Sequence, residues 1–336
     1  MFWGVRSPAP RPYARRVSTS GMLDRVERIC REPLDARSLR ERVLEALRRG
    51  LPFDGHVWPL TDPVTGVGTS PHADVPMLAW PDLPRLVRNR YVDPDGAWRE
   101  QIAALGVSGT TSVELTDRFG AWGWLELWRC GGSFGGDETA LLAALAGTLT
   151  QGVRASQART FVEDAERLEL AGPAVVLLGP GLDVVSQTST AGAALRQLNP
   201  PGEEPIQDPI PAAAINVGAA LLAAEAGRPV GPPWSRVHLG GGCWVTLRAE
   251  RMTDDGIAVT IETSTPAERR EVFALAHGLS PREREVLIQL CTGADSRTIA
   301  RTLGLSEHTL NDHVRAVLAK TSSPTRQVLL SRIAGS

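Results

Sequence analysis

The stretch that decides the fold is Leu279–Lys320, with the sequence LSPREREVLIQLCTGADSRTIARTLGLSEHTLNDHVRAVLAK. Ser280 is followed by Pro281 and, three residues after the serine, by Glu283. This spacing predicts a capped helix start, because the serine and glutamate side chains each satisfy a backbone N–H that has no partner within the helix. Gly293 then predicts the end of that helix.

Two further helices follow within the same stretch. Asp295 or Ser296 can cap a short helix, and Gly304–Ser306 predicts a tight turn. Ser306 then begins a longer helix whose apolar residues recur at i, i+4 and i+7, namely Leu310, Val314 and Val317. Two helices joined by a short glycine turn form a helix-turn-helix, and the second helix of that motif enters the major groove of DNA.

The polar face of the longer helix carries side chains that can read bases. Arg315 can pair with guanine, Asn311 with adenine, and Asp312 can accept from a cytosine amino group. Arg297 and Lys320 are expected to contact phosphates, which position a protein without reading sequence. From Glu268 to Ser336 ten Arg and Lys stand against seven Asp and Glu, so this segment is mildly basic although the whole chain carries a net charge of −2.

These residues resemble the LuxR-type (GerE-like) DNA-binding domain, a four-helix unit. Ser280–Leu287 is similar to its T-x-R-E-x-E-V-L motif and Ser306–His313 to its S-x-x-T-V-K-x-H motif, although Asn311 and Thr298 replace the usual lysine and glutamate. The resemblance implies an all-α DNA-binding domain at 267–336. The expected DNA-binding residues are Arg297, Ser306, His308, Thr309, Asn311, Asp312, Arg315, Lys320 and Arg326.

The segment preceding this domain, 172–264, predicts an antiparallel sheet. Apolar residues alternate along Ser235–Leu239, Cys243–Glu250 and Gly256–Glu262, which is typical of strands with one buried face. Ala212–Ala226 is expected to be a helix. This unit resembles a small PAS-like sheet domain.

The first unit, 22–155, predicts helices around a second sheet and resembles a GAF domain. Its strands Thr111–Thr116 and Gly123–Arg129 flank the turn Asp117–Gly120. A possible ligand pocket is assigned to four tryptophans, of which the last three share one face of a strand; they are Trp58, Trp122, Trp124 and Trp128. The alternative is that this aromatic stripe is core or dimer surface.

The remaining segments are expected to be a tail and a linker. Residues 1–21 are rich in Pro and Arg, and they predict a disordered tail or a start codon placed too early, with Met22 as the true start. Residues 156–171 predict a charged linker helix with Phe161 on its apolar stripe. The expected fold class is therefore α+β multidomain, with GAF-like and PAS-like antiparallel-sheet domains followed by the four-helix domain.

Composition disfavours several other classes of protein. The four cysteines are scattered, and no histidine pair has ligand spacing, so we expect no metal site and no cofactor. The chain has neither an apolar run of membrane-spanning length nor a signal peptide, which favours a cytoplasmic protein without a membrane partner. The motif Gly131–Gly135 surrounds Ser133 as in hydrolases, but its candidate histidines, His238 and His277, fall in other predicted units, so no catalytic residue is expected.

The sequence thus favours a one-component transcriptional regulator and not an enzyme. Its expected partners are double-stranded DNA, a second copy of the chain on that DNA, and an unidentified small molecule or protein that acts on the two units 22–155 and 172–264. The alternative is an interaction or scaffold protein whose C-terminal bundle does not bind DNA.

Overall fold

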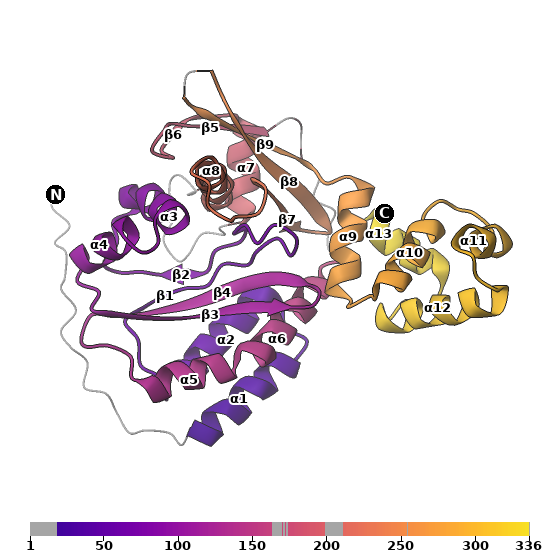
Figure 1. Cartoon of the computed structure of the whole chain (residues 1–336), viewed down its shortest axis with the longest axis horizontal. Coiled ribbons are helices and arrows are strands. Elements are labelled where there is room, and N and C mark those ends of the chain that lie inside the picture. The colour runs from indigo at the N-terminus through magenta and orange to yellow at the C-terminus, as the bar shows by residue number, and fades with distance from the viewer. Residues whose placement is uncertain are drawn as a thin grey trace.

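The computed structural model describes residues 19–162, 170, 172, 174–198, 211–253 and 255–335. A front body with two antiparallel sheets is joined to a C-terminal bundle of helices through helix α9 (Pro266–Ala276) (Figure 1). Most of the expected tail, residues 1–18, lies outside the described residues. The expected boundary at residue 21 is wrong, because helix α1 already begins at Thr19.

The first sheet has helices on one face. Its strands, in the order β2-β1-β4-β3, are β1 (Gly55–Val57), β2 (Ala73–Asp74), β3 (Gly109–Asp117) and β4 (Gly120–Arg129). The helices on that face are α1 (Thr19–Arg31), α2 (Ala36–Arg48), α5 (Gly136–Ala144) and α6 (Ala146–Arg159) (Figure 1). Leu125 and Leu127 of β4 are fully buried in the core cluster that these helices complete.

Local sequence explains the main elements of this unit. Asp35 caps α2 by accepting from the backbone N–H groups of Arg37 and Ser38, at 2.9 and 3.0 Å. Asp117 pairs with Gly120 across the β3–β4 turn. Gly123, at a φ of 154°, allows β4 to approach the segment that follows β1, because a Cβ there would lie 2.5 Å from the Pro59 carbonyl oxygen.

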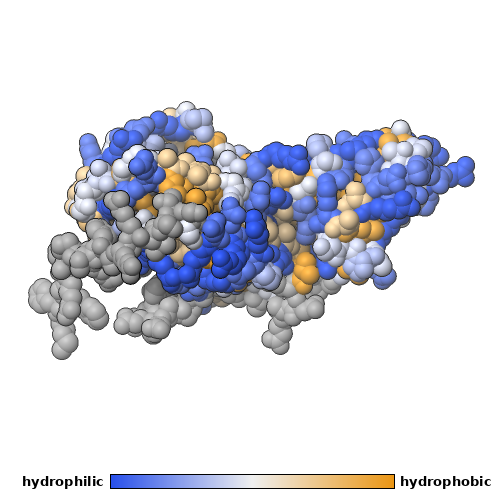
Figure 2. Space-filling model, turned by 90° about the horizontal axis from the view of Figure 1, so that it is seen from below, coloured by the Kyte–Doolittle hydropathy of each residue, from blue (hydrophilic) through white to orange (hydrophobic). Residues whose placement is uncertain are grey.

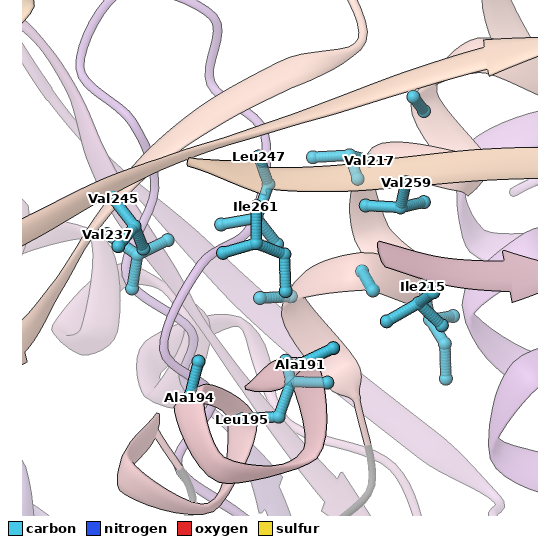
Figure 3. Close-up of a cluster of buried hydrophobic side chains, with 14 of the residues drawn as sticks. Ala191, Ala194, Leu195, Ile215, Val217, Val237, Val245, Leu247, Val259 and Ile261 are labelled. Carbon is cyan, nitrogen blue, oxygen red and sulfur yellow. The ribbon is translucent and has the colours of Figure 1, made fainter. Parts of the chain in front are cut away.

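The second sheet is five-stranded and antiparallel throughout. Its strands, in the order β6-β5-β9-β8-β7, are β5 (Ala174–Leu178), β6 (Val184–Gln187), β7 (Trp234–Gly240), β8 (Cys243–Arg251) and β9 (Ile257–Thr263). Helices α7 (Ser189–Leu198) and α8 (Ala212–Glu225) pack against it. Figure 3 shows this core, in which Leu247 and Ile261 of the sheet lie near Leu195 of α7. Val67 of the first unit is buried in the same cluster, so the two sheet units share a core.

Two helices lie in an interval where the sequence analysis places none. They are α3 (Leu83–Val92) and α4 (Ala97–Ala104), which follow the short 3₁₀ helix η1 (Trp80–Asp82). Among its described side chains α3 fully buries only Leu86 and Asn89, so its apolar stripe is weak. Helix α3 packs beside α8 and so closes one end of the space between the two sheets (Figure 1).

The C-terminal bundle consists of α9 and four further helices, α10 (Pro281–Leu290), α11 (Ser296–Leu303), α12 (Glu307–Lys320) and α13 (Arg326–Ala334). Its core also includes Phe161 and Trp244 from the front body. The expected continuous linker helix is wrong at its start, because α6 ends at Arg159 and residues 160–162 form a turn. Residues 163–169 of that expected helix lie outside the described residues.

Figure 2 shows one face on which hydrophilic residues predominate and apolar residues form small separate areas. Within the ranges that the structure describes, no helix is long and apolar enough to cross a membrane.

Candidate nucleic-acid interface and ligand cavity

Helices α11 and α12 form the helix-turn-helix, and their ends are capped by the residues that the sequence suggests. Asp295 accepts from the backbone N–H of Thr298 at 2.9 Å, and Ser306 accepts from that of Thr309 at 3.1 Å. Gly304 ends α11 at φ 63° and ψ 37°, a left-handed conformation that glycine adopts without strain. These caps fix the start of α12, the helix expected to enter the groove.

One face of α12 is buried and the opposite face is exposed. Leu310, Val314 and Val317 lie in the bundle core. The side chain of Arg315 is 76% exposed and that of His308 is 86% exposed. Asn311 and Asp312 are exposed on the same helix. The packing therefore leaves the expected base-reading side chains free to contact a ligand as large as a DNA duplex.

Asp312 contacts two neighbouring side chains on this surface. Its Oδ1 accepts from Arg315 Nη1 at 3.0 Å, and its Oδ2 lies 3.6 Å from His308 Nε2. Exposed pairs of this kind contribute little to stability. Arg315 can therefore exchange Asp312 for a guanine edge at small cost.

Other residues expected at the DNA surface have partners within the domain. The ammonium group of Lys320 lies 2.7 Å from Glu283 Oε2, and the Glu283 side chain is only 8% exposed. Burial alone raises the pKa of Glu283, but the bonds from Lys320 and Ser280 outweigh burial and bring the pKa below its usual value. This pair joins α10 to α12, and contact of Lys320 with phosphate stays a prediction.

Arg326 and the α11 arginines complete the surface. Arg326 Nη1 donates to Ser296 Oγ at 3.0 Å, so it joins α13 to α11. Arg297 and Arg301 are exposed on α11, and the described residues give neither of them a hydrogen bond from its guanidinium group. Arg301 was not among the expected site residues, although its position one turn after Arg297 could have suggested it.

A cavity of about 990 Å³ lies between the two sheets. Its wall includes Trp122, Trp124 and Trp128 of β4. Trp58, the fourth tryptophan of the expected pocket, is not part of the wall; it is fully buried in the core on the helix side of the first sheet. The prediction that Trp58 lines the pocket is therefore wrong. The opposite wall comes from α8 and β7, and α3 lines one end.

Several polar groups line this cavity. Glu126 of β4 is buried, accepts from Trp128 Nε1 at 2.6 Å and lies 3.4 Å from Arg90 Nε. Burial raises the pKa of Glu126, with Arg90 opposing that shift. The His238 ring of β7 lies 5.4 Å from the Trp244 ring at a tilt of 39°, and burial followed by the charge of Arg269 lowers the pKa of His238 to about 4. His238 is thus neutral at pH 7.

Arg236 of β7 connects the cavity wall to both halves of the molecule. Its Nε and Nη2 donate to the two carboxylate oxygens of Asp62 at 2.7 and 3.0 Å, and both side chains are 0% exposed. Its Nη1 donates to Glu271 Oε2 at 2.7 Å and to the Glu268 carbonyl at 3.1 Å, both on α9. Because Arg236 also lines the cavity, this one side chain contacts the first unit, the cavity and α9.

Apolar contacts also connect the cavity wall to α9. Trp244 lines the cavity and stacks on Phe161 with ring centroids 5.1 Å apart. Phe161 in turn meets Phe273 of α9 edge to face at 5.2 Å. Val272 of α9 itself lines the cavity. The helix that leads into the helix-turn-helix segment is therefore part of the cavity wall.

The hydrolase-like motif has no catalytic arrangement among the described residues. Ser133 is exposed, and its carbonyl oxygen accepts from Arg129 at 3.1 Å. His277 contacts Phe273 at the base of the bundle, and His238 lies in the second sheet. No described hydrogen bond joins the Ser133 hydroxyl to a histidine.

Comparison with known proteins identifies the C-terminal segment. Residues 277–332 match the family model described as "Bacterial regulatory proteins, luxR family", so this segment is a LuxR-family helix-turn-helix domain. No curated protein matches the chain. One similar solved structure, titled "SdiA in complex with octanoyl-rac-glycerol", is 14% identical over 96% of this chain and 97% of that chain, with a TM-score of 0.30.

Proposed function

We propose that this protein is a cytoplasmic, one-component transcriptional regulator that binds double-stranded DNA as a homodimer through α11 and α12. The observation that carries the proposal is the exposed polar face of α12 in a segment that matches the LuxR-family model. Base readout by Asn311, Asp312 and Arg315 and phosphate contacts from Arg297 are parts of this proposal. Ser306 and Thr309, whose hydroxyl oxygens are 2.8 Å apart, would contact the DNA backbone.

We further propose that the front body is the sensor. The unit 22–155 would act as a GAF-like half and the unit 172–264 as a PAS-like half, with the effector bound in the cavity between them. The supporting observation is that Val272 of α9 and Arg236 line this cavity. A ligand that moves either residue would move α9, and with it the domain 267–336. Such coupling requires that the ligand interacts differently with the two positions of α9.

The test of DNA binding is selection of binding sites from random duplexes with the whole chain. We expect enrichment of a two-fold symmetric site, because a dimer with two recognition helices reads two half-sites. Affinity for the selected site should fall steeply as salt rises, since phosphate contacts release counterions. A chain that binds no duplex at low salt would support the scaffold alternative instead.

A further inference from the structure

Arg40 is a buried arginine in the wall of the cavity. It lies on α2 in the first unit and is 3% exposed. A charge removed from water is costly unless it is paired or strongly hydrogen-bonded. The partners of this guanidinium group therefore indicate whether the site is complete without a ligand.

All described partners of Arg40 are neutral carbonyl groups. Its Nε donates to the Ala36 carbonyl at 2.9 Å. Its Nη1 donates to the carbonyls of Trp58 and Ser70 at 2.8 and 2.9 Å. The described residues give Nη2 no hydrogen bond and give Arg40 no ion pair. Two of the five N–H donors of this guanidinium group, both on Nη2, thus lack an acceptor among the described residues.

The carboxylates nearest to Arg40 are held by other groups. Asp35 caps α2, and its second oxygen accepts from Ser38 Oγ at 2.6 Å. Glu41 pairs with Arg37 at 2.9 Å. His72, which also lines the cavity, supplies no negative charge, because an imidazole is either neutral or positive; burial first and Arg40 second lower its pKa to about 4, so it is neutral at pH 7.

The other buried arginine of the cavity wall differs from Arg40. Arg236 pairs with Asp62 at 2.7 Å. Arg90, which is half-buried, lies 3.4 Å from Glu126. Burial first, and the charge of Arg37 second, lower the pKa of Arg40 to about 9, so Arg40 still carries its charge at pH 7. The charges of Asp35 and Glu41 partly oppose that shift, but Arg40 forms no ion pair with any described side chain, so the cavity wall contains one buried positive charge without a paired carboxylate.

We propose that Arg40 binds an anionic group of the cavity ligand, so that the molecule sensed is a small acid with one carboxylate or phosphate on an apolar body. The proposal rests on the sensor role of the cavity proposed above. The two N–H groups of Nη2, which have no acceptor among the described residues, can donate charge-assisted hydrogen bonds to the oxygens of either anion. The tryptophans of β4 supply an apolar surface for the rest of the molecule. The volume of about 990 Å³ is sufficient for a ligand of this kind.

The experiment compares two fluorescent dyes on the whole chain. 8-Anilino-1-naphthalenesulfonate and N-phenyl-1-naphthylamine share the same rings, and only the first carries an anion. We expect Arg40→Gln to lower the affinity for the sulfonate dye by about ten-fold or more, because a charged hydrogen bond is lost. The affinity for the neutral dye should change by less than about two-fold. Arg40→Lys should keep most of the sulfonate affinity. Arg42→Gln is the matched control, because Arg42 lies on the same helix, is exposed and pairs with Glu32.

A second measurement needs no variant, which matters because Arg40 also ties the chain near Trp58 and Ser70 to α2. Dodecanoate should displace the neutral dye from the native protein at least about ten-fold better than its methyl ester does. If acid and ester displace the dye equally well, or if Arg40→Gln lowers the affinity for both dyes equally, the proposed anion site is refuted. The cavity would then still bind ligands, but without a site for an anion. Failure of every probe to bind would refute the sensor proposal as well, whereas DNA binding is tested separately.

Discussion

Arg315 and Asn311 are the residues whose role in base reading can be separated most clearly from phosphate contact. We expect Arg315→Ala and Asn311→Ala each to cost about 1–3 kcal/mol on a selected site and much less on scrambled DNA, because each loses a bidentate base contact. Arg297→Ala should weaken binding to both DNAs about equally, since phosphate contacts carry no sequence information. Fluorescence anisotropy on both duplexes measures this. Equal losses on both DNAs for Arg315→Ala would mean that Arg315 contacts the backbone.

Lys320 illustrates a residue whose structural partner the sequence does not reveal. We expect Lys320→Met to lower the free energy of unfolding by about 1–2 kcal/mol at pH 7, because it leaves the buried Glu283 carboxylate without its cation. Arg31→Met, which breaks the exposed pair with Glu27, is the control and should change stability by less than about 0.5 kcal/mol. Urea unfolding measures both.

The pH dependence of the Lys320→Met effect has a definite sign. The pKa of Glu283 is lowered from 4.5 in the folded protein, so its ionised form stabilises the fold above pH 4.5. That contribution is lost as the pH falls through the lowered pKa, where native protein and variant should become equally stable. A difference between the two that persists unchanged at the lowest pH would assign the effect to lost packing of the lysine stem.

At the scale of elements, the sequence predicts those helices whose ends carry local signals. The starts of α10, α11 and α12 follow from Ser280, Asp295 and Ser306, because a cap depends on residues three positions apart. Helices α3 and α4 are not predicted from the sequence, because their few buried residues form no clear apolar stripe along the helix. The sequence does not predict the end of α6 at Arg159, because Phe161 continues the apolar spacing of the helix. In the structure Phe161 packs instead against Trp244 and Phe273.

The bundle is expected to retain its function when separated from the front body. We expect the fragment 267–336 to fold and bind DNA, because four of its helices have their own caps and core. Its start at α9 should fray, since Phe273 loses the contact with Phe161. Circular dichroism and a salt titration of DNA binding measure these properties. A fragment that folds without binding DNA at low salt would contradict the assignment of α12 as the recognition helix.

At the scale of the whole molecule, the cavity could not be predicted from sequence. Asp62 and Arg236 are 174 residues apart, and nothing in their local sequence shows that they form a buried pair. The tryptophans of β4 indicated a possible pocket, but not that the second sheet forms its opposite wall. Such contacts depend on how the two sheets pack, and side-chain periodicity reports only which face of each strand is buried.

The contact between Arg236 and Glu271 gives the last prediction. Glu271→Gln leaves the buried Asp62–Arg236 pair intact and weakens only the ion pair between Arg236 and the Glu271 side chain, which is 51% exposed. The bond from Arg236 to the Glu268 carbonyl of α9 is kept. We expect little change in stability, because an exposed charge of this kind contributes less than about 1 kcal/mol. The coupling between cavity and DNA should nevertheless decrease, since Glu271 lies between them.

Coupling is reciprocal, so it can be measured from the cavity side. Saturation with a selected DNA site should change the affinity of the native protein for N-phenyl-1-naphthylamine, and Glu271→Gln should reduce that change. The matched control is Glu285→Gln, because Glu285 pairs with Arg282 within α10 and has no contact with Arg236 among the described residues. If DNA changes dye affinity equally in all three proteins, the ion pair between Arg236 and Glu271 does not carry the coupling, and any signal must pass through other contacts of α9, such as the Glu268 carbonyl, Val272 or Phe273. If DNA leaves dye affinity unchanged even in the native protein, the two sites are not coupled, because a ligand shifts an equilibrium only by its differential affinity for the two states.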